Sequence, residues 1–171
     1  MDLLLFRHGH AENSIPPGGN DNDRKLTAAG RKGLEAAAPA WVSLAPAPTV
    51  IVVSPLVRAR QTADILVAAL GAATEHGQSP SLQIENALRP DGSTEHALEV
   101  LPETDSVWIV THMPLVGDLV ARLAVGTDRS SMPLTPGMGV WLELPGHHIG
   151  YGGRVVASLS QEAAEKVARG Q

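Results

Sequence analysis

Three short apolar runs, each followed directly by polar residues, constrain the fold of this chain more than any other feature. They cover residues 3–6, 50–53 and 107–110. Short apolar runs bounded by turn residues are typical of the buried strands of a parallel sheet. Helical patterns lie between these runs, and strands that alternate with helices predict helices packed on a central sheet. We therefore expect an α/β three-layer sandwich, with a mixed, mostly parallel central sheet flanked by helices.

The expected elements follow one another without an internal repeat or a domain linker, so residues 1–171 are expected to form a single domain. Pro39 lies inside the first helical pattern and predicts a kink or an early end of that helix. Residues 12–25 are rich in Gly, Pro, Asn and Asp and predict a loop. We expect strands at 2–6, 50–54, 82–84, 107–111, 140–144 and 154–159, and helices starting at Thr27, Pro55, Thr94, Leu115 and Ser160.

Composition narrows the classes of function. The formal net charge is −5 and the Lys and Arg residues are scattered, which argues against a nucleic-acid surface. The chain has no cysteine, which excludes disulfides, thiolate metal sites and a cysteine nucleophile. No run approaches the roughly 18–20 apolar residues that cross a bilayer, and the first residues lack the pattern of a signal peptide. We expect a cytoplasmic protein that binds neither nucleic acid nor membrane.

Arginine and histidine residues follow the apolar runs. Arg7 and His8 follow the first run, Arg58 follows the second, and His112 follows the third. In open α/β sheets, ligands bind outside the carboxyl ends of the strands, so these side chains are expected to converge. The planar guanidinium group binds phosphoryl oxygens in pairs. The pattern predicts a pocket for a doubly charged tetrahedral anion such as a phosphoryl group.

Phosphoryl transfer also needs a nucleophile, and a neutral histidine is the candidate that this chain offers. Neighbouring guanidinium groups disfavour the imidazolium form and are expected to keep one histidine neutral. We assign this role to His8, which stands between Arg7 and Gly9. Gly9 is expected to let the backbone turn sharply and approach the anion. His112 is expected to carry a proton and to stabilise charge on the phosphoryl oxygens. We expect no metal ion and no cofactor.

The order of these motifs resembles that of the histidine phosphatase superfamily, also called the phosphoglycerate-mutase-like superfamily. Residues 7–11 (Arg-His-Gly-His-Ala) resemble its RHGxA signature, and residues 26–30 resemble its LTxxG helix start. Residues 54–63 resemble its SPxxRAxQTA segment, and residues 111–116 resemble the late motif that bears the second histidine. The short length, the sparse middle region and the His-x-Pro-Leu-Val sequence are most similar to SixA-type phosphohistidine phosphatases.

This resemblance implies a phosphoglycerate-mutase-like fold and dephosphorylation of phosphohistidine on signalling proteins. By position, it implies that His8 is phosphorylated during the reaction and that Arg7, Arg58 and His112 complete the phosphate pocket. His10 occupies the variable position of the signature. We interpret it either as a rim residue of the pocket that contacts substrate or as a plain surface residue.

Many members of the superfamily carry an acidic residue in the middle region that protonates the leaving oxygen. The candidates here are Glu85, Asp91 and Glu95, none of them within a clear motif. Asp91 is kept as a candidate substrate-binding residue, although it also fits a turn before Gly92. An imidazole leaving group takes up a proton itself near neutral pH, so a missing acid favours a phosphoramidate over a sugar phosphate. The pair at 147–148, His-His, fits a hairpin tip better than a metal site.

These observations predict a metal-independent phosphatase that works through a phosphohistidine intermediate, with phosphohistidine on a protein as its substrate. A small-molecule phosphate monoesterase is the alternative within the same chemistry. A phosphoryl-binding regulatory module without turnover is the alternative from a different class. Release of inorganic phosphate that depends on His8 separates the enzymes from the module.

Overall fold

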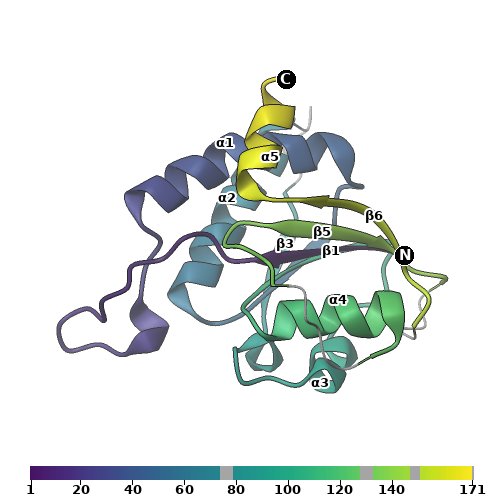
Figure 1. Cartoon of the computed structure of the whole chain (residues 1–171), viewed down its shortest axis with the longest axis horizontal. Coiled ribbons are helices and arrows are strands. Elements are labelled where there is room, and N and C mark those ends of the chain that lie inside the picture. Colours follow the sequence, from purple (N-terminus) through teal and green to yellow (C-terminus); the bar gives the residue numbers. More distant parts are fainter. Residues whose placement is uncertain (74–78, 128–132, 147–150, 171) are drawn as a thin grey trace.

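The computed structural model describes residues 1–73, 79–127, 133–146 and 151–170. A single six-stranded sheet stands between two layers of helices (Figure 1). This arrangement confirms the predicted three-layer α/β sandwich. The strands are β1 (Asp2–Arg7), β2 (Val50–Val53), β3 (Ser81–Ile84), β4 (Ser106–Thr111), β5 (Gly139–Glu143) and β6 (Arg154–Leu159).

The sheet is mixed and mostly parallel, as predicted. Its strand order is β3-β2-β4-β1-β5-β6. β1 pairs in parallel with β4, and β2 pairs in parallel with both β4 and β3, so the three apolar runs lie side by side. β5 is antiparallel to β1, and β6 is antiparallel to β5. In this register Arg7 is opposite Thr111 and Val53 is opposite Val110, which aligns the carboxyl ends of the central strands.

Helices cover both faces of the sheet. The first face carries α1 (Ala28–Leu44), α2 (Val57–Ala73) and α5 (Gln161–Ala168), and the second carries α3 (Thr94–Glu99) and α4 (Leu115–Val125) (Figure 1). Helices are expected to start at Thr27 and Ser160, and both residues are N-caps, because their hydroxyl oxygens accept the N–H groups of Gly30 and Ala163. None of the helices in the described ranges is long and apolar enough to span a membrane.

The central strands contribute to two hydrophobic cores, because successive side chains of a strand point to opposite faces. Leu4 and Phe6 of β1 belong to the core beneath α1, α2 and α5. Leu3 and Leu5 belong to the core beneath α4. Phe6 meets Trp41 of α1 edge to face, with ring centroids 5.5 Å apart. Burial on both faces explains why these runs are continuously apolar, and it fixes the position of the strand ends.

Some local features differ from the sequence predictions. α1 continues through Pro39 to Leu44, so the predicted early end of this helix is wrong. Packing of Trp41 and the neighbouring alanines on the sheet outweighs the hydrogen bond that Pro39 cannot donate. α2 begins at Val57 instead of Pro55. Short 3₁₀ turns at 21–23 and 86–88 lie in segments that are predicted as loop or turn. The sequence does not reveal them, because a single helical turn is too short to leave a periodic pattern. Residues 147–150, with the paired histidines, lie outside the described residues.

Candidate active site

The carboxyl ends of the central strands bring the predicted anion-binding residues together. Arg7 is the last residue of β1, and His112 directly follows β4. Arg58 lies in the first turn of α2, which follows β2. The N–H of His8 donates to Thr111 O at 3.0 Å, which continues the β1–β4 ladder beyond the strands. The rings of His8 and His112 face each other with centroids 4.9 Å apart, and all of these arginine and histidine side chains line one cavity.

This cavity has a volume of about 430 Å³, which is within the range of small-ligand sites. The strand ends and the start of α2 supply its buried wall. A second part of the lining comes from the 12–25 segment and the residues just before it, namely His10, Ala11, Asn13, Asp21 and Arg24. Pro90, Met113 and Pro136 complete the lining. The cavity therefore combines a rigid wall from the sheet with a wall from a loop.

The backbone fixes the tautomer of His8, whose side chain is buried. Nδ1 of its ring lies 2.7 Å from Gly9 O. A carbonyl oxygen only accepts hydrogen bonds, so Nδ1 carries the ring proton and Nε2 keeps its lone pair. Arg58 Nε donates to this Nε2 at 3.3 Å. His8 thus presents an unprotonated nitrogen directly beside a guanidinium group.

Arg58 is 3% exposed and is held on its outer side by Asp21. Its Nη1 donates to Asp21 O at 2.7 Å, and its Nη2 donates to Asp21 Oδ2 at 3.0 Å. Arg24 Nε donates to the other carboxylate oxygen of Asp21 at 2.7 Å. The guanidinium plane of Arg58 is therefore fixed between His8 and the 12–25 segment.

Two buried nitrogens of the cavity residues have no hydrogen-bond partner within the described part of the chain. They are Arg7 Nε and His112 Nδ1. The other contacts of these side chains hold them in place, because Arg7 Nη1 donates to Leu134 O at 2.6 Å and His112 Nε2 lies 2.7 Å from Ser54 Oγ. With the Ser54 hydroxyl as donor to Nε2, Nδ1 of His112 carries a proton. Unpartnered buried donors are uncommon and costly, and an anion would supply acceptors for both.

Burial lowers the pKa of both cavity histidines. Desolvation is the largest cause of the shift that lowers the pKa of His8 to about 4, and the charges of Arg58 and Arg7 lower it further. Desolvation, followed by the influence of His8 and Arg58, lowers the pKa of His112 to about 2. His8 is therefore neutral near pH 7, as predicted, but burial acts more strongly than the arginine charges. Burial disfavours the imidazolium form of His112 as well, so the proton that this ring can donate to an anion is the single proton of the neutral imidazole.

Gly9 is placed differently from the sequence prediction. It does not line the cavity, and its backbone does not adopt a positive φ. Its N–H donates to Thr62 Oγ1 at 3.1 Å, and its carbonyl accepts from His8. A Cβ at this position would lie 2.4 Å from Leu34 Cδ1. Close packing against α1 therefore requires the glycine, and a sharp backbone turn does not. His10 is exposed and lines the cavity, so the structure places it at the rim.

The acidic candidates of the middle region lie outside this cavity. Asp91 and Glu85 line a neighbouring groove that shares no residue with the cavity of the histidines. Asp91 is exposed, and its carboxylate lies 3.5 Å from Arg89 Nε. Glu85 accepts a hydrogen bond from Gln83 Nε2 at 3.0 Å. Glu95 is exposed in the first turn of α3. The structure therefore does not bring Asp91 together with the predicted catalytic residues.

Sequence reasoning does not identify several polar residues at the site. Thr62 Oγ1 accepts from Gly9 N–H and donates to Arg58 O at 2.8 Å, so it joins the end of β1 to α2. A signal for Thr62 exists, because it follows Arg58 by one helical turn and shares its face. Ser54 directly follows β2, which is an equivalent signal. Asp21 and Arg24 lie in a segment without periodicity, and no local pattern marks them.

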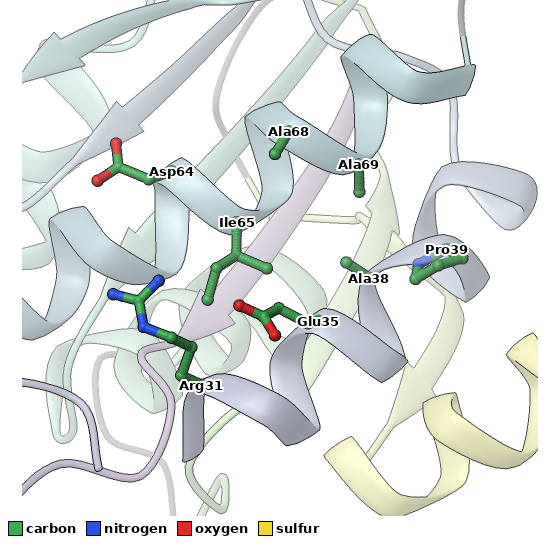
Figure 2. A pocket seen from close by; sticks show the side chains of 8 residues that line it. All are labelled: Arg31, Glu35, Ala38, Pro39, Asp64, Ile65, Ala68 and Ala69. Atoms are coloured by element: carbon green, nitrogen blue, oxygen red, sulfur yellow. The ribbon is translucent and has the colours of Figure 1, made fainter. Parts of the chain in front are cut away.

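A second cavity, of about 360 Å³, lies between α1 and α2 (Figure 2). Arg31, Glu35 and Asp64 surround an apolar floor that includes Ile65 and Pro39. This cavity contains no histidine and shares no residue with the histidine cavity. It therefore lacks the paired histidines that distinguish the first cavity. Within the described ranges, no group of three or more His, Asp or Glu side chains is arranged to hold a metal ion.

Comparison with known families assigns the chain. Residues 3–89 match the model of the histidine phosphatase superfamily (branch 1). The chain belongs to this superfamily. An uncharacterized protein of Picosynechococcus sp. (strain ATCC 27264 / PCC 7002 / PR-6) is 36% identical over 132 residues, which are 74% of this chain and 74% of that protein. Membership supports phosphatase activity and confirms the resemblance inferred from the motifs.

Solved structures share the fold over most of the chain. The protein histidine phosphatase SixA complexed with tungstate matches with a TM-score of 0.75 and 24% identity, over 94% of this chain and 97% of that chain. A SixA protein described as a phosphohistidine phosphatase from Agrobacterium tumefaciens matches with a TM-score of 0.73 and 20% identity, over 93% and 97%. A mycobacterial glucosyl-3-phosphoglycerate phosphatase matches with a TM-score of 0.66 and 18% identity, over 93% and 98%. The fold is thus SixA-like, and it is shared by phosphatases with different substrates.

Proposed function

We propose that this protein is a phosphatase that forms a covalent phosphohistidine at His8 and acts on phosphohistidine carried by another protein. The arrangement of the His8 ring carries this proposal. Its Nδ1–H donates to Gly9 O at 2.7 Å, and its Nε2 accepts from Arg58 Nε at 3.3 Å. A neutral imidazole with a fixed, unprotonated nitrogen beside a guanidinium group is suited to attack a bound phosphoryl group.

In the first step, Nε2 of His8 attacks the phosphorus atom of the substrate. A P–N bond forms while the bond between phosphorus and the leaving group breaks, and the electron pair of that bond goes to the leaving group. The phosphorylated ring becomes cationic because Nδ1 keeps its proton. The hydrogen bond from Nδ1 to Gly9 O strengthens as this charge develops.

Donors in the buried wall stabilise the phosphoryl oxygens during transfer. Arg7 Nε and His112 Nδ1, both buried and without partners among the described residues, are proposed to donate to these oxygens. Arg58 keeps two N–H groups on Asp21, and its Nε–H leaves Nε2 of His8 when that lone pair attacks phosphorus, so three of its five donors are available to the anion during transfer. Donors that are already oriented in a water-poor site stabilise developing charge effectively. The arginines supply the positive charge, so the proposed reaction needs no metal ion.

In the second step, water attacks the phosphorus atom of phosphorylated His8. The P–N bond breaks, its electron pair returns to Nε2, and inorganic phosphate leaves with the oxygen and both protons of the water. The same donors contact the phosphoryl oxygens in both steps. The enzyme therefore returns to its starting tautomer, with the ring proton still on Nδ1.

Phosphohistidine is the preferred substrate because its leaving group is an imidazole, which takes up its own proton near neutral pH. The acidic candidates Glu85, Asp91 and Glu95 do not line the cavity, so none is placed to protonate an alcohol. The likeness to SixA supports the same choice. A small phosphate monoester is the second candidate, because the fold is also that of a glucosyl-3-phosphoglycerate phosphatase.

The test compares wild type, His8→Ala and His96→Ala, which removes an exposed histidine of α3 and serves as a matched control. Release of inorganic phosphate is measured from a phosphohistidine protein and from p-nitrophenyl phosphate, with a metal chelator present. We expect fast turnover of the phosphohistidine protein, slow ester hydrolysis, and loss of both in His8→Ala only. An acid-labile phosphate should be trapped on the wild type by rapid quenching.

Each alternative has its own outcome. Ester turnover equal to or faster than that of the phosphohistidine protein would assign a small-molecule phosphatase. Full activity of His8→Ala would contradict the assignment of the nucleophile, and loss of activity with the chelator would contradict the metal-independent mechanism. Phosphate binding without turnover of either substrate would indicate a regulatory module.

A further inference from the structure

Asp21 lines the catalytic cavity together with His8, Arg58 and His112. Its side chain is 55% exposed, whereas that of its partner Arg58 is 4% exposed. Asp21 contacts Arg58 through its backbone carbonyl at 2.7 Å and through its carboxylate at 3.0 Å. Arg58 in turn contacts Nε2 of His8 at 3.3 Å. One guanidinium group therefore separates the carboxylate from the proposed nucleophile.

The surroundings of Asp21 keep this carboxylate ionised. The hydrogen bond from Arg24 is the largest cause that lowers the pKa of Asp21, and the charge and hydrogen bond of Arg58 lower it further. The groups of other elements that face it are Arg58 at the start of α2 and His112 after β4, and the charge of Asp21 partly opposes the burial that lowers the pKa of His112. An ionised carboxylate has no proton to give to an alcohol leaving group.

We infer that Asp21 selects substrates whose leaving group is cationic, namely phosphoramidates protonated on nitrogen, over phosphate esters. This inference rests on the proposed function, and it names the chemical property by which the site recognises phosphohistidine. The geometric reason is that Asp21 lines the cavity, one guanidinium group away from Nε2 of His8, and has a side chain that is 55% exposed. The negative charge of this carboxylate attracts a ring that carries a positive charge and repels a leaving group that becomes anionic.

The transfer step needs no proton from the enzyme when the leaving group is cationic. The substrate is an imidazole with phosphorus on one ring nitrogen and a proton on the other. Nε2 of His8 forms a bond to phosphorus, the original P–N bond breaks, and its electron pair returns to the ring nitrogen. The product is a neutral imidazole that retains its proton on the second nitrogen. With an ester, the same step yields an alkoxide or phenolate, which the carboxylate of Asp21 disfavours.

The test is the ratio of kcat/KM for phosphoimidazole to kcat/KM for p-nitrophenyl phosphate, measured for wild type, Asp21→Asn and Asp23→Asn. Asp23 is the matched control, because it does not line the cavity and an asparagine there keeps an oxygen that accepts the 2.8 Å hydrogen bond from Asn20 N–H, which preserves the cap next to Asp21. We expect Asp21→Asn to lower the ratio roughly three- to tenfold, as the loss of one partly solvated ion pair predicts. The ratio for Asp23→Asn should equal that of wild type.

The pH dependence of kcat gives a second readout, which a purely structural role of Asp21 would not move. kcat reports ionisations in the enzyme–substrate complex. The carboxylate of Asp21 favours the protonated form of bound phosphoimidazole and so should raise its pKa. Without this charge, the decrease of kcat with rising pH should begin at a lower pH. The profile for p-nitrophenyl phosphate should lack this displacement, because that leaving group takes up no proton before transfer.

The outcomes separate the inference from the proposed function. An unchanged ratio in Asp21→Asn, or an equal decrease in Asp23→Asn, would overturn the inference while leaving catalysis by His8 intact. A uniform loss with both substrates would also overturn it and would reduce Asp21 to a support for Arg58. Turnover of both substrates by His8→Ala would instead contradict the proposed function itself.

Discussion

The two walls of the catalytic cavity differ in how they are built. Arg7, His8 and His112 stand at or just beyond the ends of strands that are buried on both faces. Asp21 and Arg24 stand on a segment that a short 3₁₀ turn and a few hydrogen bonds hold in place. The first wall depends on the sheet and its two cores. The second depends on contacts that involve exposed or half-exposed side chains.

This difference indicates a division of roles. The strand-end wall, formed by Arg7, His8 and His112, presents the nucleophile and the unpartnered donors, which any phosphoryl group requires. The segment wall, formed by Asp21, Arg24 and Asn13, presents a carboxylate and further polar groups. We expect these groups to act on the leaving group, which is the part of the substrate that differs between phosphatases. Loops are more mobile and tolerate change better than the elements they connect. We therefore expect changes in the first wall to alter catalysis, and changes in the second wall to alter selectivity.

The largest effect is expected at the strand-end wall. His112→Ala removes a donor that is oriented by Ser54 at 2.7 Å before the substrate arrives. kcat should fall by roughly 10²- to 10³-fold for phosphohistidine and ester alike, which is typical for loss of one preoriented donor. Steady-state phosphate release measures this change, with His96→Ala as the control. A drop confined to one substrate would contradict the proposed division between the walls.

Acidification should destabilise the protein through the same histidines. Burial lowers the pKa of His8 to about 4 and that of His112 to about 2, whereas the unfolded chain takes up protons at these rings near pH 6.5. The folded state binds fewer protons in this window, so stability is present above pH 6.5 and is lost as the pH falls. The loss between pH 7.5 and 5 should be on the order of 2–4 kcal/mol for the two rings together.

Urea unfolding at the two pH values measures this dependence. The variant His8→Gln/His112→Gln has no titrating ring in the strand-end wall, so its stability should change less over the same window. The lowered pKa of Asp21 acts below the ordinary value of 3.8 and does not contribute between pH 5 and 7.5. An equally steep dependence in the double variant would show that other groups cause the acid sensitivity.

The strand-end wall is also the part of the site that the sequence predicts well. Continuous apolar runs indicate parallel strands that are buried on both faces, and neighbouring parallel strands have their carboxyl ends at the same edge of the sheet. The position of a polar residue directly after such a run, as at His8 and His112, therefore predicts its place in space. The sheet register then brings these residues together without any further information.

The positions of the residues in the segment wall could not be predicted from the sequence in this way. The position of Asp21 results from hydrogen bonds to Arg58, which is distant in the sequence, and from the cap that Asn20 and Asp23 form. Neither produces a periodic pattern. Gly9 illustrates a related limit, because the contact with Leu34 that requires the glycine depends on how α1 packs against β1. Tertiary contacts decide both cases, and local propensity does not.

Gly9→Ala should destabilise the strand-end wall by steric overlap. The added Cβ would lie 2.4 Å from Leu34 Cδ1, so the fold must shift to accommodate it. Overpacking of this kind costs about 1–3 kcal/mol, and each kcal/mol lowers the Tm by about 2–4 °C in a chain of this size. Leu34→Val removes the overlapping atom and should recover part of the loss in the double variant. Thermal unfolding of both single variants and the double variant measures the coupling, and simple additivity would contradict the packing explanation.

The smallest effect is expected where the segment wall is attached to the rest of the protein. Arg89 Nη2 donates to Asn22 Oδ1 at 3.2 Å, next to Asp21 in the sequence. Asn22→Ala removes this bond, so the carboxylate of Asp21 should leave its position beside Arg58 more often. We expect the ratio of phosphoimidazole to ester turnover to fall roughly twofold. Arg89→Ala removes the same bond, together with the contact to Asp91 outside the cavity, so it should have a similar effect on the ratio and the double variant should show no further decrease. Asn86→Ala, in the other 3₁₀ turn, is the control and should leave the ratio unchanged. A decrease in kcat for both substrates would place this bond in support of the strand-end wall, and the contrast between the two walls would then no longer hold.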